Sequence, residues 1–417
     1  MKSIFWLSLI SILYAYFGYP ILVWALSRLR PRPWKKSTIT PSISILLAVH
    51  NGAALLDKKV EHLLTLDYPN LREVIVVSDG SSDGTAEMLA AMRHPLLKTI
   101  VLTEHAGKAV ALNAGIARAT GEILVFVDIR PEVAAGSIQT LVNNFADPAV
   151  GCVAGELLLR HDFPNGTTGA ITGLYWRYEQ WIRKCESLVD SPVGVYGGFY
   201  AVRRELVQLQ PDGLILDDMF QPLSIIRQGY RSVLDPDANV FDVWPKKMGA
   251  EFHRKVRTLA GNFQLIQLAP WLLTTRNRVL FQFVSHKVMR LVVPYLSLLL
   301  LASTIALSSG SRLFALIAIA QLLVLSLAVA GLFARIPLLN FISGPASALL
   351  MLNAAAVVGL YKFCFTRGPL WRIWTSGTAP QLRPADAIVY DKYAEARACA
   401  MVEEAQAVHA DAEAPRP

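Results

Sequence analysis

The chain has 417 residues, a formal net charge of +8 and 53% hydrophobic residues, with a mean hydropathy of +0.38. This composition is too apolar for one ordinary soluble domain, and the length allows two or three domains. The basic residues crowd beside apolar stretches, so anionic lipid headgroups account for the charge better than nucleic acid, which we do not expect as a partner.

An uncharged stretch from about Ile4 to about Leu26 lies near the start of the chain. It is long enough to span a bilayer core, too long for a signal peptide, and without a clear small-residue cleavage site. We therefore expect a retained transmembrane anchor over residues 1–30. The basic cluster Arg28–Lys36 follows, and the positive-inside rule places it and the next domain in the cytoplasm.

Strand and helix patterns alternate in the next part of the chain, residues 40–245. Strands are expected at about 42–48, 74–77, 98–102 and 121–128, and helices at about 53–65, 85–92 and 107–119. This alternation predicts an α/β fold with a doubly wound, mostly parallel sheet.

The second of these strands ends abruptly in a polar turn that contains Asp79, Gly80, Asp83 and Gly84. Open α/β sheets bind ligands at the carboxyl ends of their strands. The glycines permit tight turns, and the carboxylates offer acceptors to a base or a ribose. A plain Asx turn followed by a helix cap would give a similar pattern.

The C-terminal half is dominated by amphipathic and apolar segments. Residues 170–186 predict an amphipathic helix, and residues 246–285 predict interfacial amphipathic helices. Residues 286–366 contain about three candidate transmembrane helices, at about 288–307, 313–333 and 341–361. If all the apolar segments cross the membrane and the α/β domain is cytoplasmic, the C-terminus lies outside the cytoplasm. The basic residues after the last segment instead favour the cytoplasmic side. Either one segment does not cross or the tail does not follow the positive-inside rule. Residues 367–417 read as a basic and then disordered tail.

A series of short motifs runs through the chain in a fixed order. They are Ile43–Asn51, Val76–Thr85, Gly107–Gly115, Phe126–Asp128, Gly197–Arg204, Leu216–Asp218, Gly229–Arg231 and Arg254–Arg257. The ordered set resembles the membrane-embedded family 2 glycosyltransferases, the group that includes cellulose, hyaluronan and poly-N-acetylglucosamine synthases. The resemblance covers roughly residues 40–265. It implies a glycosyltransferase-A (Rossmann-like) fold, a nucleotide-diphosphate-sugar donor and inversion at the anomeric carbon.

The resemblance assigns the donor nucleotide to the first strand ends. The positions that match the family's nucleoside-binding residues are Ala48, His50, Asn51, Asp79 and Asp83. Lys108 matches a residue that helps to hold the donor nucleotide, and an ammonium group suits a diphosphate. Alternatively, Lys108 is a solvated charge at the start of a helix.

Asp128 matches the first carboxylate of the family's Asp-x-Asp pair, which binds the diphosphate through Mg²⁺ or Mn²⁺. The second carboxylate is replaced by Arg130. An arginine can bind phosphate directly, or it can pair with Asp128 and weaken metal binding. The alternative without a functional role is that Asp128 caps a turn and Arg130 is a surface charge.

Asp217 and Asp218 match the family's paired acids, of which the second is the general base for the acceptor hydroxyl. Paired acids raise one pKa, which suits a base. Because residues 219–226 look helical, the two acids could instead favour a helix N-terminus.

Arg254 and Arg257 align with the family's Gln-x-x-Arg-Trp motif. Arg257 keeps the arginine, which would stabilise charge on the leaving diphosphate. Arg254 replaces the glutamine and Thr258 replaces the tryptophan, which puts polymer elongation in doubt. These arginines could also form a basic helix face on anionic lipid.

Four residues are candidates for the acceptor side. Gly197 and Gly198, before Phe199, would let the backbone approach the acceptor closely, and Trp176 could stack on sugar rings. Core or interface packing is the alternative for all of them.

We expect an inner-membrane, multi-pass, inverting glycosyltransferase with a cytoplasmic catalytic domain. It would move a sugar from a nucleotide donor to a growing polysaccharide or a lipid-linked glycan. The alternatives are single transfer onto a membrane lipid and a catalytically inactive membrane scaffold or nucleotide sensor, the latter supported only by Arg130.

Overall fold

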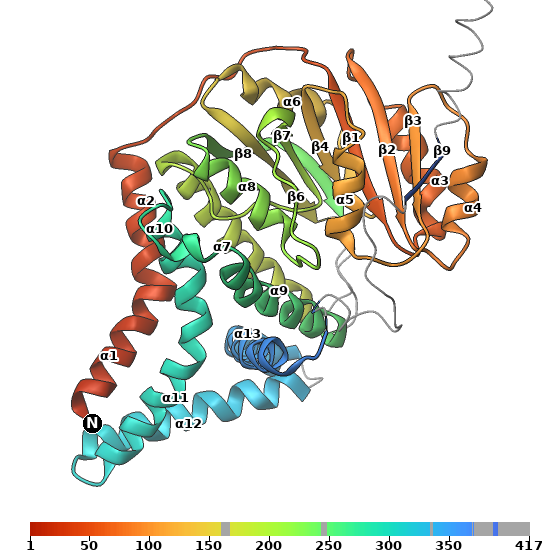
Figure 1. Ribbon diagram of the computed structural model, residues 1–417. Coiled ribbons are helices and arrows are strands. Elements are labelled where there is room, and N and C mark those ends of the chain that lie inside the picture. The colour runs from red at the N-terminus through yellow and green to blue at the C-terminus, as the bar shows by residue number, and fades with distance from the viewer. Residues whose placement is uncertain (160–166, 243–247, 334–336, 369, 371–386, 391–417) are drawn as a thin grey trace, which may run out of the picture.

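A computed structural model describes residues 1–159, 167–242, 248–333, 337–368, 370 and 387–390. It consists of an α/β domain and a group of long helices that extend away from it (Figure 1). The chain begins in the helical group, passes into the α/β domain, and returns to the helices.

The strands are β1 Ile43–Val49, β2 Leu71–Asp79, β3 Leu97–Leu102, β4 Ile123–Val127, β5 Glu132–Val133, β6 Val150–Leu159, β7 Phe199–Arg203, β8 Arg231–Asp242 and β9 Ala387–Tyr390. They form one sheet in the order β5-β8-β6-β7-β4-β1-β2-β3-β9. The run β4-β1-β2-β3 is parallel, as predicted. The sheet as a whole is mixed, because β7 is antiparallel to both β4 and β6, and β5 and β9 are antiparallel edge strands.

Helices cover both faces of this sheet. The helices of the domain are α3 Ala53–Leu64, α4 Thr85–Ala91, α5 Lys108–Ile116, α6 Ser137–Asn143, α7 Thr167–Val189 and α8 Asp217–Arg227. Because side chains alternate along a strand, Ile45 of β1 joins the core beneath α3, α4 and α6, whereas Leu46 joins the core beneath α5. Both side chains are almost completely buried, so the doubly wound arrangement predicted from the sequence is confirmed.

Among the residues that the structure describes, four helical segments are long and apolar enough to cross a membrane, namely Lys2–Leu29, Leu280–Ser308, Arg312–Leu332 and Ser343–Phe365. They are built from α1 Lys2–Leu13, η1 Tyr14–Gly18, α2 Tyr19–Leu29, α10 Leu280–Gln282, η5 Phe283–Val288, α11 Met289–Ser308, α12 Arg312–Phe333 and α13 Pro337–Phe365. Large apolar side chains such as Leu7, Leu298 and Leu323 are exposed on them. This exposure fits lipid-facing surfaces and confirms one N-terminal and three C-terminal apolar helices.

The end of α13 lies beside the α/β domain. α13 runs along α9 (Met248–Leu268), where the backbone at Gly359 approaches Ala260 closely. Leu370 packs in the cluster that contains Ile215 of the domain, and β9 pairs with the edge strand β3. Leu370 and β9 therefore lie against the α/β domain. The strand β9 falls within the predicted disordered tail and is not anticipated by the sequence analysis.

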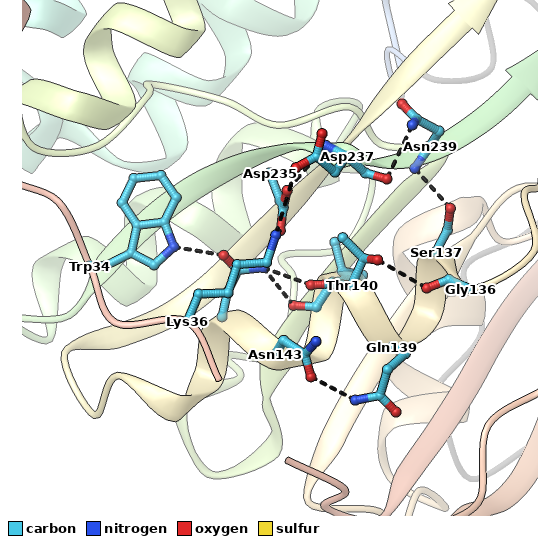
Figure 2. Close-up of polar contacts among 12 residues, drawn as sticks. Trp34, Lys36, Gly136, Ser137, Gln139, Thr140, Asn143, Asp235, Asp237 and Asn239 are labelled. Atoms are coloured by element: carbon cyan, nitrogen blue, oxygen red, sulfur yellow. Dashed lines mark hydrogen bonds and ion pairs between the residues drawn. The ribbon is translucent and has the colours of Figure 1, made fainter. Parts of the chain in front are cut away.

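The segment that joins the N-terminal helix to the domain lies against α6 and β8 (Figure 2). Trp34 donates a hydrogen bond from Nε1 to Oδ1 of Asn144 at 2.6 Å. The ammonium group of Lys36 lies 2.6 Å from the buried carboxylate of Asp235, which also accepts a bond from Asn144. These contacts hold the linker in one position on the domain.

A second set of polar contacts lies where the membrane helices meet α7. Glu186 accepts a hydrogen bond from the Tyr19 hydroxyl at 2.5 Å and contacts Nδ1 of His286 at 2.7 Å. Nε2 of His286 lies 3.2 Å from Glu179, which also pairs with Arg290. Both membrane segments contain a π-helical turn here, η1 and η5, and such turns are frequent at functional sites.

Candidate functional site

Three neighbouring parallel strands end at one edge of the sheet. Ala48 near the end of β1 pairs with Val77 of β2, and Leu47 pairs with Val127 of β4. Asp79 and Asp128 therefore emerge at the same edge, the carboxyl edge at which open α/β sheets bind ligands.

Lys108 lies at the centre of the charged residues at this edge. It is the first residue of α5, and its Nζ is 3.0 Å from Oδ1 of Asp128 and 3.0 Å from Oδ2 of Asp217. The two carboxylates raise the pKa of the Lys108 ammonium group against the opposing effect of burial. Lys108 thus stays protonated and joins residues from two elements that are far apart in sequence.

Asp218 follows Asp217 in the first turn of α8. Burial, and then the neighbouring Asp217 carboxylate, raise the pKa of Asp218 to about 6, while Lys108 lowers it. A carboxyl group with this pKa is ionised at neutral pH and can still accept a proton, as a general base must.

The glycine pair Gly197-Gly198 lies between Asp218 and Asp128. A Cβ atom on Gly197 would be 2.9 Å from Cβ of Asp218, and one on Gly198 would be 2.7 Å from the Tyr196 ring. The backbone N–H of Asp128 donates to the Gly198 carbonyl at 3.3 Å. Only glycine permits this close approach, which brings the two carboxylates to the same side of the sheet.

The structure corrects the expectation that Asp79 offers free acceptors to a nucleoside. Its carboxylate is buried and accepts bonds from the backbone N–H groups of Ala106 and Gly107, at 2.8 and 2.9 Å. His105 Nδ1 is a third partner at 2.8 Å. Asp79 therefore holds the loop before α5, and Gly80, with φ of 55°, lets the backbone turn against this loop.

The other residues predicted to bind the nucleoside surround this loop. The His50 ring stacks on His105 with a centroid distance of 3.6 Å. Asn51 has a positive φ of 52°, and its Oδ1 accepts a bond from the Ser82 backbone. Asp83 accepts bonds from the backbone N–H groups of Ala53 and Thr85, and its bonds with Thr85 lower its pKa.

Arg130 does not pair with Asp128. Its guanidinium group lies 3.4 Å from Oδ2 of Asp242, at the end of β8. The Asp128 side chain is 41% exposed, so Oδ2 remains accessible to a ligand. Within the described residues no group of three or more His, Cys, Asp or Glu side chains is arranged to hold a metal ion. Mg²⁺ and Mn²⁺ sites built on one or two carboxylates and substrate phosphates do not need such a cluster, so Asp128 fits a metal that the donor diphosphate helps to hold.

Arg254 and Arg257 lie on the exposed face of α9. Arg254 forms two 2.8 Å hydrogen bonds with Glu251, one turn earlier. Thr258 is also exposed, and its hydroxyl donates to the Arg254 carbonyl. Within the described part of the chain, Arg257 makes no contact with the Lys108 cluster, so its role stays a prediction.

Phe199 is wrongly predicted as an acceptor-side residue. Its side chain is completely buried in the core, where it packs against Gly155 of β6. Trp176 is part-buried, lies edge-on to Tyr196 at 6.2 Å, and has the Arg183 guanidinium 5.5 Å from its ring.

Sequence reasoning missed Tyr196, Lys59 and Asp242. Burial, and then the carboxylates of Asp128 and Asp242, raise the pKa of Tyr196. Burial lowers the pKa of Lys59 to about 8, and the same two carboxylates oppose this shift. Lys59 donates to the Pro131 carbonyl. The position of Tyr196 directly before the glycine pair could have indicated that it lies near the site. Lys59 lies in an ordinary amphipathic helix, and nothing in the local sequence distinguishes it.

Comparisons with known proteins indicate the family of part of the chain. The family model described as "Glycosyl transferase family 2" matches residues 44–208. This range contains β1 to β4, the Lys108 loop and Asp128, and ends before Asp217.

Two curated relatives are poly-β-1,6-N-acetyl-D-glucosamine synthases. The protein of Staphylococcus aureus (strain COL) is 26% identical over 270 residues, which cover 63% of this chain and 63% of that protein. The protein of Staphylococcus epidermidis is 25% identical over 296 residues, 66% of this chain and 71% of that protein. The match thus spans less than two thirds of the length of the S. aureus protein.

A solved structure shares the fold over most of the chain. It is a mannosyltransferase from Pyrobaculum calidifontis in complex with GDP-mannose and Mn²⁺, with a TM-score of 0.65 and 25% identity. The similarity covers 86% of this chain and 98% of that one. The chain therefore contains a family 2 glycosyltransferase domain with the glycosyltransferase-A fold, accompanied by apolar helices long enough to span a membrane.

Proposed function

We propose that this chain is an inverting glycosyltransferase of the inner (plasma) membrane. It transfers a sugar from a nucleotide-diphosphate-sugar donor to a growing polysaccharide or a lipid-linked glycan. The bridge that Lys108 makes between Asp128 and Asp217, with Asp218 beside it, is the observation that carries the proposal.

The bridge brings a phosphate-binding cation and a general base into one place. Lys108 neutralises the diphosphate as it leaves, and Asp218 takes the proton of the acceptor hydroxyl. The hydroxyl oxygen bonds to the anomeric carbon as the bond to the diphosphate breaks, from the opposite side of the sugar ring, so the configuration inverts. Asp128, with the donor diphosphate, would hold a Mg²⁺ or Mn²⁺ ion, which when bound supplies further positive charge for the leaving group.

Two features bear on the number of sugars transferred. Thr258 replaces a tryptophan of the polymerising enzymes that the sequence resembles, and its exposed position on α9 favours single transfer onto a membrane lipid. The three apolar segments after the domain favour a route for a secreted polymer. The length of the product made by purified membranes from labelled donor distinguishes the two activities.

The membrane orientation follows from charge. The cluster Arg28–Lys36 joins the N-terminal apolar helix to the catalytic domain, and such clusters stay on the cytoplasmic side. The catalytic domain therefore meets nucleotide sugars in the cytoplasm.

The test is a panel of nucleotide sugars with the purified full chain, followed by detection of released nucleoside diphosphate. We expect release with at least one sugar, dependent on Mg²⁺ or Mn²⁺. Release that is unchanged in Asp218→Asn, or no release with any sugar in the presence of membrane extract, contradicts the proposal.

A further inference from the structure

Two cations lie beside Asp218 on the side of the membrane helices. Arg183 belongs to α7, and Lys287 belongs to η5, at the start of the apolar segment Leu280–Ser308. Both side chains are part-buried, and both lower the pKa of Asp218 through their charge. Arg183 lies over the Trp176 ring, which is edge-on to Tyr196, and Gly197 after Tyr196 faces the Asp218 side chain. Lys287 follows His286, which contacts Glu179 and Glu186 on α7, the helix that carries Arg183.

Neither cation has an anionic partner within the described residues. Arg183 lies over the Trp176 ring at 5.5 Å and forms no ion pair there. Lys287 forms neither an ion pair nor a hydrogen bond with the described part of the chain. A part-buried charge without a direct ion pair is less favourable than a paired one, because it loses hydration and is only partly compensated by more distant charges.

The nearby carboxylates are already engaged by other cations. Glu179 contacts Arg290 and His286. Glu251 accepts two bonds from Arg254 and lies 3.7 Å from Lys255. Glu186 contacts Tyr19 and His286. None of these three acids forms an ion pair with Arg183 or Lys287 in the described part of the chain.

Lys255 adds a further positive charge to this region. Burial, the neighbouring Arg254 and also Arg183 lower the pKa of Lys255 to about 8, which places it close to the other cations. Within the described residues, Arg183 and Lys287 thus remain as two cations that form no ion pair, which favours the binding of an anion in this region.

The donor diphosphate already has its own cation in Lys108, beside Asp128. The second set of cations lies where an apolar helix enters the domain, at the depth of lipid headgroups. An anion bound there belongs to a molecule that lies in the membrane and reaches Asp218.

We propose that Arg183 and Lys287 bind the phosphate of a membrane-lipid-linked acceptor whose sugar hydroxyl is presented to Asp218. This inference rests on the proposed function and selects the lipid-linked glycan as its acceptor. In the transfer, the sugar hydroxyl loses its proton to Asp218 and its oxygen bonds to the anomeric carbon of the donor. The nucleoside diphosphate leaves with the electron pair of the broken bond, and the phosphate of the lipid is unchanged.

The test measures binding of two probes to the full chain in phosphatidylcholine nanodiscs. The probes are a polyprenyl phosphate and the polyprenol of the same length, so they differ only in the phosphate. We expect the phosphate to bind at least about tenfold more tightly, and the double variant R183Q/K287Q to lose that preference. Arg30→Gln removes an exposed cation on the same membrane side and serves as the matched control, which should keep the preference.

Donor binding and thermal unfolding of the double variant show whether the domain is intact. If R183Q/K287Q unfolds, the single variant K287Q replaces it, and K287R should restore binding. Equal binding of the two probes by the wild type, or a preference that survives both substitutions, overturns the inference.

Two further arms separate the remaining possibilities. If phosphatidylglycerol in the nanodisc abolishes the preference, the cations bind ordinary headgroups and the inference is wrong. If the preference depends on Arg183 and Lys287 but no nucleotide sugar is turned over with a polyprenyl-diphosphate-linked sugar, the phosphate site stands and the proposed function fails.

Discussion

Lys108 determines the balance of charge in the candidate site. Its ammonium group lies between the carboxylates of Asp128 and Asp217 at 3.0 Å from each, and it also lowers the pKa of Asp218. The same side chain can therefore neutralise the leaving diphosphate and keep the general base ionised.

Asp218→Asn is expected to reduce kcat by about 10²–10⁴-fold, because an amide cannot accept the hydroxyl proton. Donor affinity should change little, since the donor phosphates lie with Lys108. Initial rates of nucleoside diphosphate release, together with donor binding, provide the measurement. A variant with nearly normal kcat would show that another group is the base.

The pH profile of the wild type gives a second prediction. Asp218 acts as a base only when ionised, so kcat/KM should rise with pH up to its pKa of about 6 and then level off. Lys108→Met removes a charge that lowers this pKa, so the rising limb should move to higher pH. Asp217→Asn removes a charge that raises the pKa of Asp218, so the rising part of the kcat/KM profile should move to lower pH. Shifts in the same direction for both variants would contradict the charge assignment.

At the scale of elements, the site depends on a close approach between the turn before β7 and the start of α8. The Asp218 carbonyl accepts a hydrogen bond from the backbone N–H of Val195, and Gly197 faces the Asp218 side chain. The position of the base is thus set by backbone contacts between two elements that are separated in sequence.

Gly197→Ala tests this approach. A Cβ atom would lie 2.9 Å from Cβ of Asp218, so α8 or the turn must shift. A displacement of about 1 Å in a catalytic group can reduce the rate by about 10²-fold, and we expect kcat to fall far more than thermal stability. Gly310→Ala is the control, because a Cβ atom there meets nothing within 4 Å. Normal activity in Gly197→Ala would mean that the approach has no role in placing the base.

At the scale of the whole molecule, the catalytic domain is attached to the membrane helices through polar contacts. The linker binds through Trp34 and Lys36, and Glu186 of α7 binds Tyr19 of the N-terminal helix and His286 of the next one. These contacts hold the α/β domain in one position relative to the apolar helices.

Lys36→Met is expected to destabilise the protein by about 1–2 kcal/mol, because the buried Asp235 loses its ammonium partner. Thermal unfolding of the full chain in detergent is the measurement. Lys35→Met is the matched control, since only the backbone N–H of Lys35 bonds to the domain, through Asp147. Equal destabilisation by both substitutions would show that the Lys36 contact does not hold the linker.

Much of this protein can be predicted from local patterns. Strands β1 to β4, the helices between them and the apolar segments follow from periodicity and apolar length, because burial imposes these patterns directly on the sequence. The positions of Lys108, Asp128 and Asp218 follow from the ordered motifs.

Tertiary structure alone decided which of the candidate side chains are available for chemistry. Asp79 and Phe199 are buried by contacts with distant segments, and Arg130 pairs with Asp242 from a strand about a hundred residues away in sequence. Likewise, Arg183 and Lys287 form no ion pair with the described residues, and this depends on which carboxylates packing brings near them. A local pattern records the propensity and burial of its own residues, whereas hydrogen-bond and ion-pair partners come from segments that meet only when the chain folds.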